Sequence, residues 1–264
     1  MIWIYKEDRL FKTDSMRQAL EPERETPRVQ RPVISTVGAG GKTTTLHRLA
    51  EEYVRAGIPV LVTTTTHILK EDRPFFLTGY SEEKIRDVLE KYGQAWIGDP
   101  APEGKLMKLP DDAFEKLMKL AEQIISERTG RPGRLPVLIE ADGAKRLPLK
   151  VPAEHEPVIP EMTTHVLSVY GLDSIGKKIE ETVFRPERAE ILLNKNRTEC
   201  VTARDIARLA AHQSAGRKGC PADAVYTVVL NKADSEKERH AALEICRMLA
   251  GSGIRRIIVT GGNV

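Results

Sequence analysis

Short runs of β-branched and aliphatic residues recur along most of the chain, separated by stretches with helical spacing. Each run is continuously apolar rather than alternating, which is typical of strands buried on both faces of a parallel sheet. The runs predicted to be strands are 33–37, 59–64, 136–141, 165–170, 226–230 and 256–260. Because helical stretches separate them, the sequence predicts an α/β fold with a mostly parallel sheet between two layers of helices.

The helical stretches repeat apolar residues every three or four positions. One stretch carries Leu46, Leu49, Ala50, Tyr53 and Val54 and ends before a glycine and a proline, and the ranges 114–121 and 242–249 follow the same spacing. Ser235 and Glu238 have the spacing of a capping box, which predicts the start of the last helix.

Two regions depart from this alternation of strand and helix. Residues 1–30 are charged and weakly patterned, so we expect an N-terminal appendage followed by one nucleotide-binding domain at 31–264. Residues 65–135 are expected to form an inserted subregion, with a helix near 81–92 and two short strands around a Pro/Gly turn. The stretch 143–160 is dense in proline, which argues against a regular helix.

Composition limits the classes of partner. The 264 residues include 41 Lys and Arg against 38 Asp and Glu, and this net charge of +3 gives no argument for binding nucleic acid. The apolar runs are too short to cross a membrane, and the charged N-terminus does not resemble a signal peptide. Three widely spaced cysteines, Cys200, Cys220 and Cys246, suit free thiols in a reducing compartment, so we expect a cytoplasmic protein. A homodimer is left open.

The candidate site begins with a glycine loop between the first predicted strand and its helix. Three glycines allow the backbone to fold around an anion, so that amides and the helix N-terminus face phosphate oxygens. Lys42 is then expected on the β- and γ-phosphates, and the Thr43 hydroxyl on Mg²⁺. The candidate nucleotide-binding residues are Gly38, Ala39, Gly40, Gly41, Lys42, Thr43 and Thr44. The fold predicted is therefore a P-loop NTPase-like three-layer fold.

The loop has the shorter GxxGKT form that is found in Mur ligases, because Thr36 stands where the full P-loop pattern has its first glycine. This form keeps an ATP-dependent ligase or kinase open beside a GTPase. In such an enzyme a second substrate, rather than water, accepts the phosphoryl group.

An NKxD motif, Asn231, Lys232 and Asp234, follows a predicted buried strand. In GTPases this motif reads guanine, because the Asp carboxylate accepts hydrogens from N1 and N2, where adenine would leave it unpaired. A plain strand-to-helix turn remains the alternative, since Asn and Asp are common in turns.

A third signal is the pair of acids at the end of the strand near 136–141. Glu140 and Asp142 alternate along the strand and would point to the same side, toward the glycine loop. We expect Asp142 to serve Mg²⁺ and Glu140 to act on the nucleophile, although the spacing itself does not decide between them. Thr65, Thr66 and His67 follow the second strand, where P-loop proteins sense the γ-phosphate, and are further catalytic candidates.

Together the motifs VGAGGKTTTL, LVTTTTHI, EADGAKRLPLKVPAEHEPVIP, FRPE and VVLNKAD resemble the YqeC family of selenium-dependent hydroxylase accessory proteins. The resemblance extends over about 31–260. Within these motifs it also covers Lys145, Lys150, His155, Glu156 and 185–187. The family implies a role in maturing selenium-containing molybdenum hydroxylases, with a hydroxylase or a cofactor-maturation protein as partner.

The resulting hypothesis is a P-loop protein that binds Mg²⁺ and GTP and hydrolyses the nucleotide slowly. The alternatives are the ATP-dependent ligase or kinase and a nucleotide-bound adaptor without catalysis.

Overall fold

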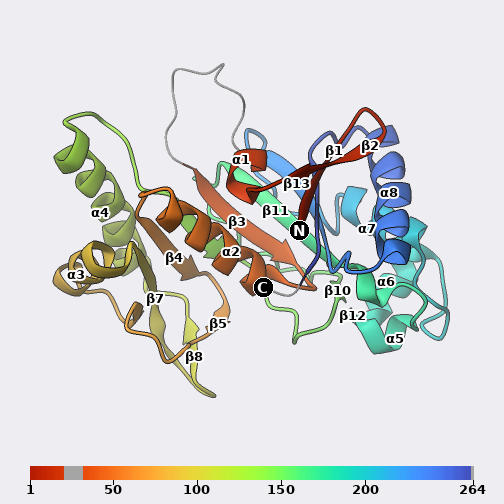
Figure 1. Ribbon diagram of the computed structural model, residues 1–264. Coiled ribbons are helices and arrows are strands. Elements are labelled where there is room, and N and C mark those ends of the chain that lie inside the picture. The colour runs from red at the N-terminus through yellow and green to blue at the C-terminus, as the bar shows by residue number, and fades with distance from the viewer. Residues whose placement is uncertain (21–31, 263–264) are drawn as a thin grey trace.

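A large, mostly parallel sheet forms the centre of the computed structural model, which describes residues 1–20 and 32–262 (Figure 1). Its strands are β1 (Ile2–Lys6), β2 (Arg9–Thr13), β3 (Val33–Gly38), β4 (Val60–Thr64), β5 (His67–Leu69), β6 (Phe76–Thr78), β7 (Gln94–Ala101), β8 (Lys105–Met107), β9 (Val137–Glu140), β11 (His165–Gly171), β13 (Val225–Asn231) and β14 (Ile257–Thr260). They lie in the order β2-β1-β14-β13-β11-β3-β9-β4-β7-β8-β5, with β6 beside β7. Neighbours from β14 to β7 are parallel.

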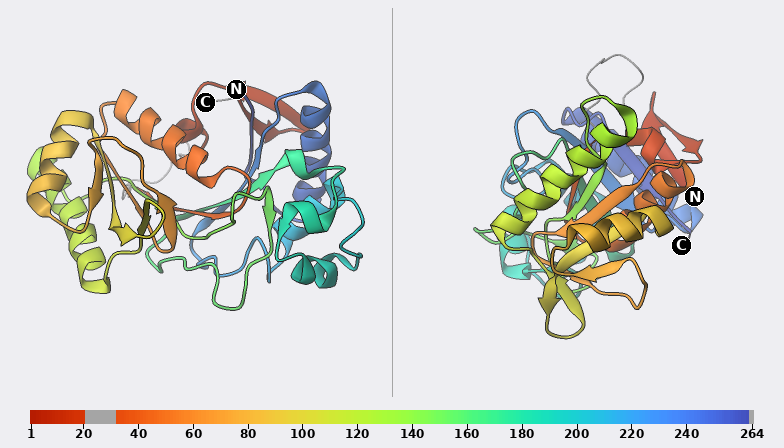
Figure 2. Two further views of the ribbon diagram at one scale, coloured as in Figure 1. Left: turned by 90° about the horizontal axis from the view of Figure 1, so that it is seen from below. Right: turned by 90° about the vertical axis from the view of Figure 1, so that its left-hand side faces the viewer.

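Helices flank this sheet. They are α1 (Met16–Leu20), α2 (Lys42–Arg55), α3 (Glu82–Tyr92), α4 (Asp111–Thr129), α5 (Ile179–Thr182), α6 (Pro186–Leu193), α7 (Ala203–Ala211) and α8 (Glu236–Gly251), with a 3₁₀ turn η1 (Leu172–Ser174). In the views of Figure 2, α3 and α4 lie at one end of the molecule and α8 at the other. The predicted strands and helices are confirmed, including the capping box of Ser235 and Glu238, and the arrangement is consistent with the predicted three-layer P-loop-like fold.

The continuous apolar strands supply two hydrophobic cores, which lie on opposite faces of the sheet at β13. Val229 of β13 belongs to the core that includes α2 and α4, whereas Val228 and Leu230 belong to the core under α7 and α8. Successive side chains of a strand point to opposite faces, so a strand between two cores must be apolar at every position. This explains why no polar alternation is visible in the sequence of β13.

The inserted region at 65–135 lies between β4 and β9 along the chain. Its strand β7 pairs in parallel with β4, while β8 and β5 continue the sheet as antiparallel strands. Helix α3 matches the helix expected near 81–92. The insertion therefore extends the main sheet instead of standing apart from it.

The N-terminal segment differs from the expectation of an appendage at 1–30. Strand β1 pairs with β14 in an antiparallel register, and β2 pairs with β1. Met16 and Leu20 of α1 are buried in the core beside α2. Residues 1–20 thus belong to the sheet and the core, whereas the rest of this expected appendage, 21–30, lies outside the described residues. The charged residues of β1 and β2 interrupt the apolar pattern of these edge strands, so the sequence did not predict them.

The proline-dense stretch 143–160 forms no helix, as expected. Its only regular element is β10 (Leu149–Lys150), which pairs in parallel with β12 (Val183–Phe184). This small pair brings the stretch after β9 close to the segment that starts α6. The three cysteines, Cys200, Cys220 and Cys246, are free thiols.

Candidate functional site

The carboxyl ends of β3, β9 and β4 meet at one edge of the sheet. Thr36 of β3 and Thr64 of β4 both stand opposite Glu140 in the strand register. In open α/β sheets this edge is where ligands bind, because the loops leaving the strands surround a crevice there. The glycine loop, residues 38–42, leaves β3 at this edge and passes directly into α2.

Backbone conformation explains why the loop needs glycine. Gly38, Gly40 and Gly41 have φ of 83°, 79° and 131°, values that L side chains rarely adopt. A Cβ atom on Gly40 would lie 2.3 Å from the backbone nitrogen of Gly171, so no larger residue fits. Ala39 is buried, and its amide donates to the carbonyl of β11 at Val169, 2.9 Å away.

Lys42, Thr43 and Glu140 form the centre of the site. The buried Lys42 Nζ donates to the Gly38 carbonyl at 2.9 Å, and Thr43 Oγ1 donates to Glu140 Oε2 at 2.8 Å. Burial lowers the pKa of Lys42. Burial also raises the pKa of Glu140, and the positive charge of Lys42 partly offsets this rise. Thr44 is exposed and lies on the cavity wall.

Asp142 belongs to a separate chain of ion pairs. Its carboxylate pairs with Lys150, whose Nζ also lies 2.7 Å from Glu156 Oε2. The guanidinium of Arg185 binds Glu156 with both of its terminal nitrogens, at 2.6 and 3.0 Å. Burial alone would raise the pKa of Glu156, but the hydrogen bonds from Arg185 and Lys150 outweigh it and lower the pKa to about 2.

The two acids, of which we expected Asp142 to serve Mg²⁺ and Glu140 to act on the nucleophile, have different partners. Thr43, expected to hold a metal ion together with Asp142, is hydrogen-bonded to Glu140 instead. The Asp142 carboxylate accepts a hydrogen bond from the Gly38 amide at 3.4 Å, in addition to its ion pair with Lys150. The distinction follows from Lys150, which is eight positions along the chain from Asp142 and enters the site only through the fold.

A cavity of about 1110 Å³ opens beside the glycine loop. Its lining combines loop residues, cations and acids from seven segments of the chain. The residues are Gly40, Gly41, Lys42, Thr43, Thr44, His67, Ile68, Leu69, Glu103, Lys105, Glu140, Gly143, Ala144, Lys145, Arg146, Leu147, Glu156, Phe184, Arg185 and Lys232.

The NKxD residues contact the glycine loop. Asn231 Nδ2 donates to the Gly40 carbonyl at 2.8 Å, and its Oδ1 accepts from Thr260 Oγ1 at 2.7 Å. Lys232 lies on the cavity wall, where its Nζ pairs with Asp173 at 2.8 Å. Two segments almost two hundred positions apart are thereby held against each other.

Asp234 lies at the outer end of this segment. It is exposed, and its Oδ1 accepts the Gly262 amide at 2.6 Å. It is not part of the cavity lining, in contrast to Lys232.

Of the three candidates Thr65, Thr66 and His67, two make hydrogen bonds within the fold and one lines the cavity. Thr65 Oγ1 donates to the Val158 carbonyl at 2.7 Å, and the amide of Thr66 donates to Thr64 Oγ1 at 3.0 Å. The buried Thr66 hydroxyl has no hydrogen-bond partner among the described residues. Only His67 of these three candidates lines the cavity.

Sequence reasoning did not assign roles to Arg146, Phe184 or Asp173. Arg146 and Phe184 lie within motifs that the sequence singled out, GAKRLPLK and FRPE, and both line the cavity. Asp173 lies in η1, and its ion pair with Lys232 connects it to the site. No spacing in the sequence signals that contact.

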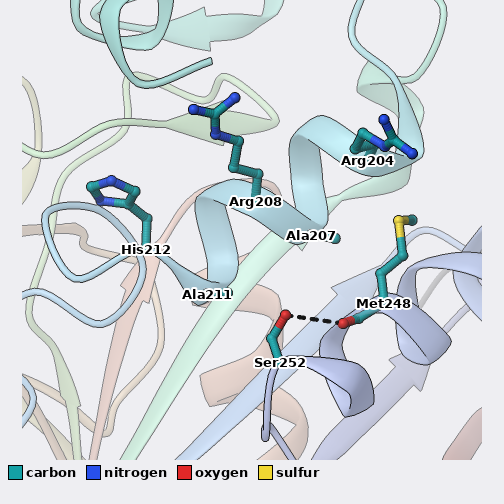
Figure 3. Close-up of a pocket in the computed structure, with 7 residues that line it drawn as sticks. All are labelled: Arg204, Ala207, Arg208, Ala211, His212, Met248 and Ser252. Atoms are coloured by element: carbon teal, nitrogen blue, oxygen red, sulfur yellow. Dashed lines mark hydrogen bonds between the residues drawn. The ribbon is translucent and has the colours of Figure 1, made fainter. Parts of the chain in front are cut away.

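A second hollow of about 370 Å³ lies between α7 and α8 (Figure 3). Arg204, Arg208 and His212 line it along α7, and Met248 and Ser252 line it from α8. The Arg208 guanidinium donates to the Leu193 carbonyl at 3.1 Å. No carboxylate, glycine loop or strand end opens into this hollow, so it does not offer the chemistry of the main cavity.

Residues 1–20 and 32–262 lack two features, a cluster of metal-ligating side chains and a membrane-spanning helix. There is no group of three or more His, Cys, Asp or Glu side chains there that could hold a metal ion. No helix in these segments is long and apolar enough to cross a membrane.

Comparison with known proteins identifies the family. A family model described as "YqeC protein" matches residues 34–187, which is more than half of the chain. The chain is also 30% identical over 193 residues to "Uncharacterized protein YqeC" of Escherichia coli (strain K12), covering 72% of this chain and 71% of that protein. The chain therefore belongs to the YqeC family, which confirms the resemblance seen in the sequence. The family match includes the glycine loop, both acids and Arg185, and ends before the NKxD segment.

Proposed function

We propose that this protein binds a nucleoside triphosphate with Mg²⁺ in the main cavity, prefers GTP, and slowly hydrolyses it. The observation that carries the proposal is the combination of a glycine loop with the buried Lys42 and the Thr43–Glu140 hydrogen bond of 2.8 Å. These groups stand together at the carboxyl edge of a parallel sheet, where the loop amides and the start of α2 favour an anion.

The charges of the site suit a polyphosphate. Lys42 is the first residue of α2 and is buried, so its ammonium group has lost most of its hydration. An anionic ligand would stabilise this charge by charge-assisted hydrogen bonds. In phosphoryl transfer, positioning and electrostatic stabilisation carry most of the catalysis. We assign Lys42 and the loop amides to the β- and γ-phosphates.

The residues also fit a magnesium ion. The Thr43 hydroxyl donates its hydrogen bond to Glu140, so the lone pairs of its oxygen are free for a hard cation. The ligand atoms would all be oxygens, which Mg²⁺ prefers. Thr43 and Glu140 would hold the ion, so our assignment moves from Asp142 to Glu140. A bound Mg²⁺ would neutralise charge on the phosphates.

Guanine preference rests on the NKxD segment. Asn231 fastens the segment to Gly40 and to Thr260, so Lys232 borders the same cavity as the phosphate-binding residues. Asp234 would accept the N1 and N2 hydrogens of guanine. His67 is the member of the threonine segment that could meet the γ-phosphate or the attacking water from the cavity wall.

The family resemblance gives this activity its proposed setting, the maturation of selenium-dependent molybdenum hydroxylases. Nucleotide turnover would drive delivery or insertion of a cofactor component to a hydroxylase or to a cofactor-maturation protein. Stimulation of GTP hydrolysis by such a partner would support this setting. A nucleotide-bound adaptor instead predicts tight binding and turnover that does not respond to the partner.

A second candidate function is phosphoryl transfer to a small acceptor, as in a kinase or an ATP-dependent ligase. The size of the cavity favours it, because about 1110 Å³ exceeds the roughly 300–1,000 Å³ of a pocket for one drug-sized ligand. This candidate predicts negligible hydrolysis of the nucleotide alone and a large increase when the acceptor is present.

Titration with fluorescent GTP and ATP analogues, with and without Mg²⁺, tests the proposal. We expect tighter GTP binding that needs Mg²⁺ and becomes about 10- to 100-fold weaker in Lys42→Ala, since charge-assisted hydrogen bonds are lost. Lys237→Ala, an exposed lysine of α8, is the matched control. Unchanged affinity and turnover in Lys42→Ala would overturn the proposal, and preference for ATP would favour the ligase or kinase.

A further inference from the structure

The main cavity carries cations that the proposed nucleotide site does not use. Lys145, Arg146 and Arg185 line it together with Phe184. The Arg185 guanidinium carbon lies 4.3 Å from the centre of the Phe184 ring, and Lys145 Nζ lies 5.3 Å from it. An aromatic ring beneath cations holds them in place without neutralising them.

Lys145 and Arg146 have no acidic partner. Both are exposed, and within the part of the chain that the structure describes neither forms an ion pair or a hydrogen bond with a carboxylate. The Arg185 charge, by contrast, is balanced by Glu156. Two neighbouring cations repel each other, and an anion bound between them would replace this repulsion with attraction.

The backbone holds these two residues in an unfavourable conformation. Lys145 and Arg146 have φ of 46° and 62°, in the left-handed region, which is unfavourable for a residue with a side chain. The conformation is fixed because the Gly40 amide donates to the Leu147 carbonyl at 3.1 Å and the Gly171 amide to the Pro148 carbonyl at 2.9 Å. The fold thus fastens the two cations directly beside the glycine loop.

We infer that Lys145, which lies over the Phe184 ring, and the neighbouring Arg146 form a second anion subsite that takes a phosphate-bearing small molecule next to the nucleotide. Arg146 can present two parallel donors to phosphate oxygens, and Lys145 adds a point charge. Ile68 and Leu69 of β5 line the same cavity and offer an apolar surface to the rest of that molecule. The subsite rests on the proposed function only for the identity of its neighbour, the nucleotide.

Calorimetric titration of the full chain with inorganic phosphate tests the subsite. The titration is made on the free protein and on protein saturated with Mg²⁺ and a non-hydrolysable GTP analogue, which fills the glycine loop. We expect saturable phosphate binding in both, weakened at least about tenfold by Lys145→Ala/Arg146→Ala, because charged hydrogen bonds are lost. The double variant Arg204→Ala/Lys237→Ala, which removes the same charges from exposed positions on α7 and α8, should bind phosphate normally.

Several outcomes would overturn the subsite. One is phosphate binding that disappears once the GTP analogue is bound, since the cations would then serve the nucleotide itself. Another is binding that is equal in the double variant and the control, or acetate binding as tightly as phosphate. Arg146→Ala alone must also weaken phosphate binding, which guards against a folding defect of the double variant.

Failure of the proposed function would look different. If the GTP analogue does not bind, phosphate titration of the free protein still reads the subsite. Phosphate binding that survives Lys42→Ala but is lost in Lys145→Ala/Arg146→Ala would then support the subsite, while the absence of GTP-analogue binding alone would reject the nucleotide proposal.

Discussion

Thr43 and Glu140 are 97 positions apart in the chain, yet one hydrogen bond of 2.8 Å joins their side chains. The contact depends on the register in which β9 lies beside β3, with Glu140 opposite Thr36. A hydroxyl that donates a hydrogen bond to a buried carboxylate is preorganised to bind a cation through its oxygen. Metal dependence should therefore be sensitive to this one hydroxyl.

Thr43→Ala is expected to remove most of the Mg²⁺-dependent part of GTP affinity. Loss of a metal ligand or its supporting hydrogen bond costs roughly 10- to 100-fold in affinity. Affinity measured in EDTA should change much less, because the loop amides and Lys42 remain. Thr78→Ala, an exposed threonine at the end of β6, should leave both affinities unchanged. Equal losses with and without Mg²⁺ would contradict the role of Thr43.

Asp234→Asn tests base recognition. The amide keeps an oxygen that can accept the Gly262 amide, so the segment should stay folded. GTP binding should weaken about 10- to 100-fold, and xanthosine triphosphate should bind better than in the unchanged chain, because the amide matches a carbonyl where guanine has an amino group. Competition titrations with GTP, ATP and xanthosine triphosphate measure the shift. An unaltered order of preference would remove Asp234 from the site.

At the site, the sequence predicted only part of the cavity lining and did not predict how the charged residues pair. The glycine loop and the NKxD motif have fixed spacings, so their place after two parallel strands could be predicted from local pattern, while their nucleotide roles stay predictions. Glu140 and Asp142 are two positions apart and were indistinguishable, because their difference comes from Lys150 and Glu156 in the proline-dense stretch. Thr65 resembled a catalytic residue, but its hydroxyl hydrogen-bonds to the Val158 carbonyl.

At the scale of elements, the β10–β12 pair joins the strand that carries the acids to the segment that carries Arg185. The Glu156 carboxylate links the two segments, because both Lys150 and Arg185 form ion pairs with it. The pKa of Glu156 is about 2 in the folded protein, below its ordinary value of 4.5. Its contribution to stability is therefore fully present above pH 4.5 and is lost as the pH falls toward 2.

Glu156→Gln should destabilise the protein at pH 6 and matter progressively less as the pH falls through this window. The difference in unfolding free energy between the two proteins should shrink by about 2–3 kcal/mol between pH 6 and pH 2. Urea unfolding at a series of pH values measures it. Glu154→Gln, in the same loop but 93% exposed at the side chain, should leave the pH dependence as it is. A constant difference across the window would show that Glu156 does not act through its charge.

Prediction of elements succeeded where apolar periodicity was strong. The strands β3, β4, β9, β11, β13 and β14 are continuous apolar runs, and α2, α4 and α8 carry clear helical spacing. It failed for β1 and β2, because Lys6, Arg9 and Lys12 interrupt the apolar residues of these two short strands. The pairing of β1 with β14 joins the two ends of the described chain, and no local pattern can signal such a contact.

At the scale of the whole molecule, this N-terminal ribbon is connected to the candidate site. Strand β1 is hydrogen-bonded to β14, and Thr260 at the end of β14 holds Asn231, which in turn contacts Gly40 of the glycine loop. Helix α1 is fastened to α2 as well, since Glu52 accepts the Met16 amide at 3.0 Å. The first twenty residues should therefore unfold together with the nucleotide-binding part.

Met16→Ala and Phe11→Ala distinguish an integral ribbon from an appendage. Met16 is fully buried, so its truncation should cost about 2–5 kcal/mol of unfolding free energy. Phe11 is 43% exposed on β2 and should cost less than about 1 kcal/mol. Urea unfolding should show one transition, shifted to lower urea only in Met16→Ala, because β1 and α1 contribute to the same cooperative core as α2. An unshifted main transition in Met16→Ala, or a separate early transition for the N-terminal segment, would mean that the segment folds independently and that the site does not depend on it.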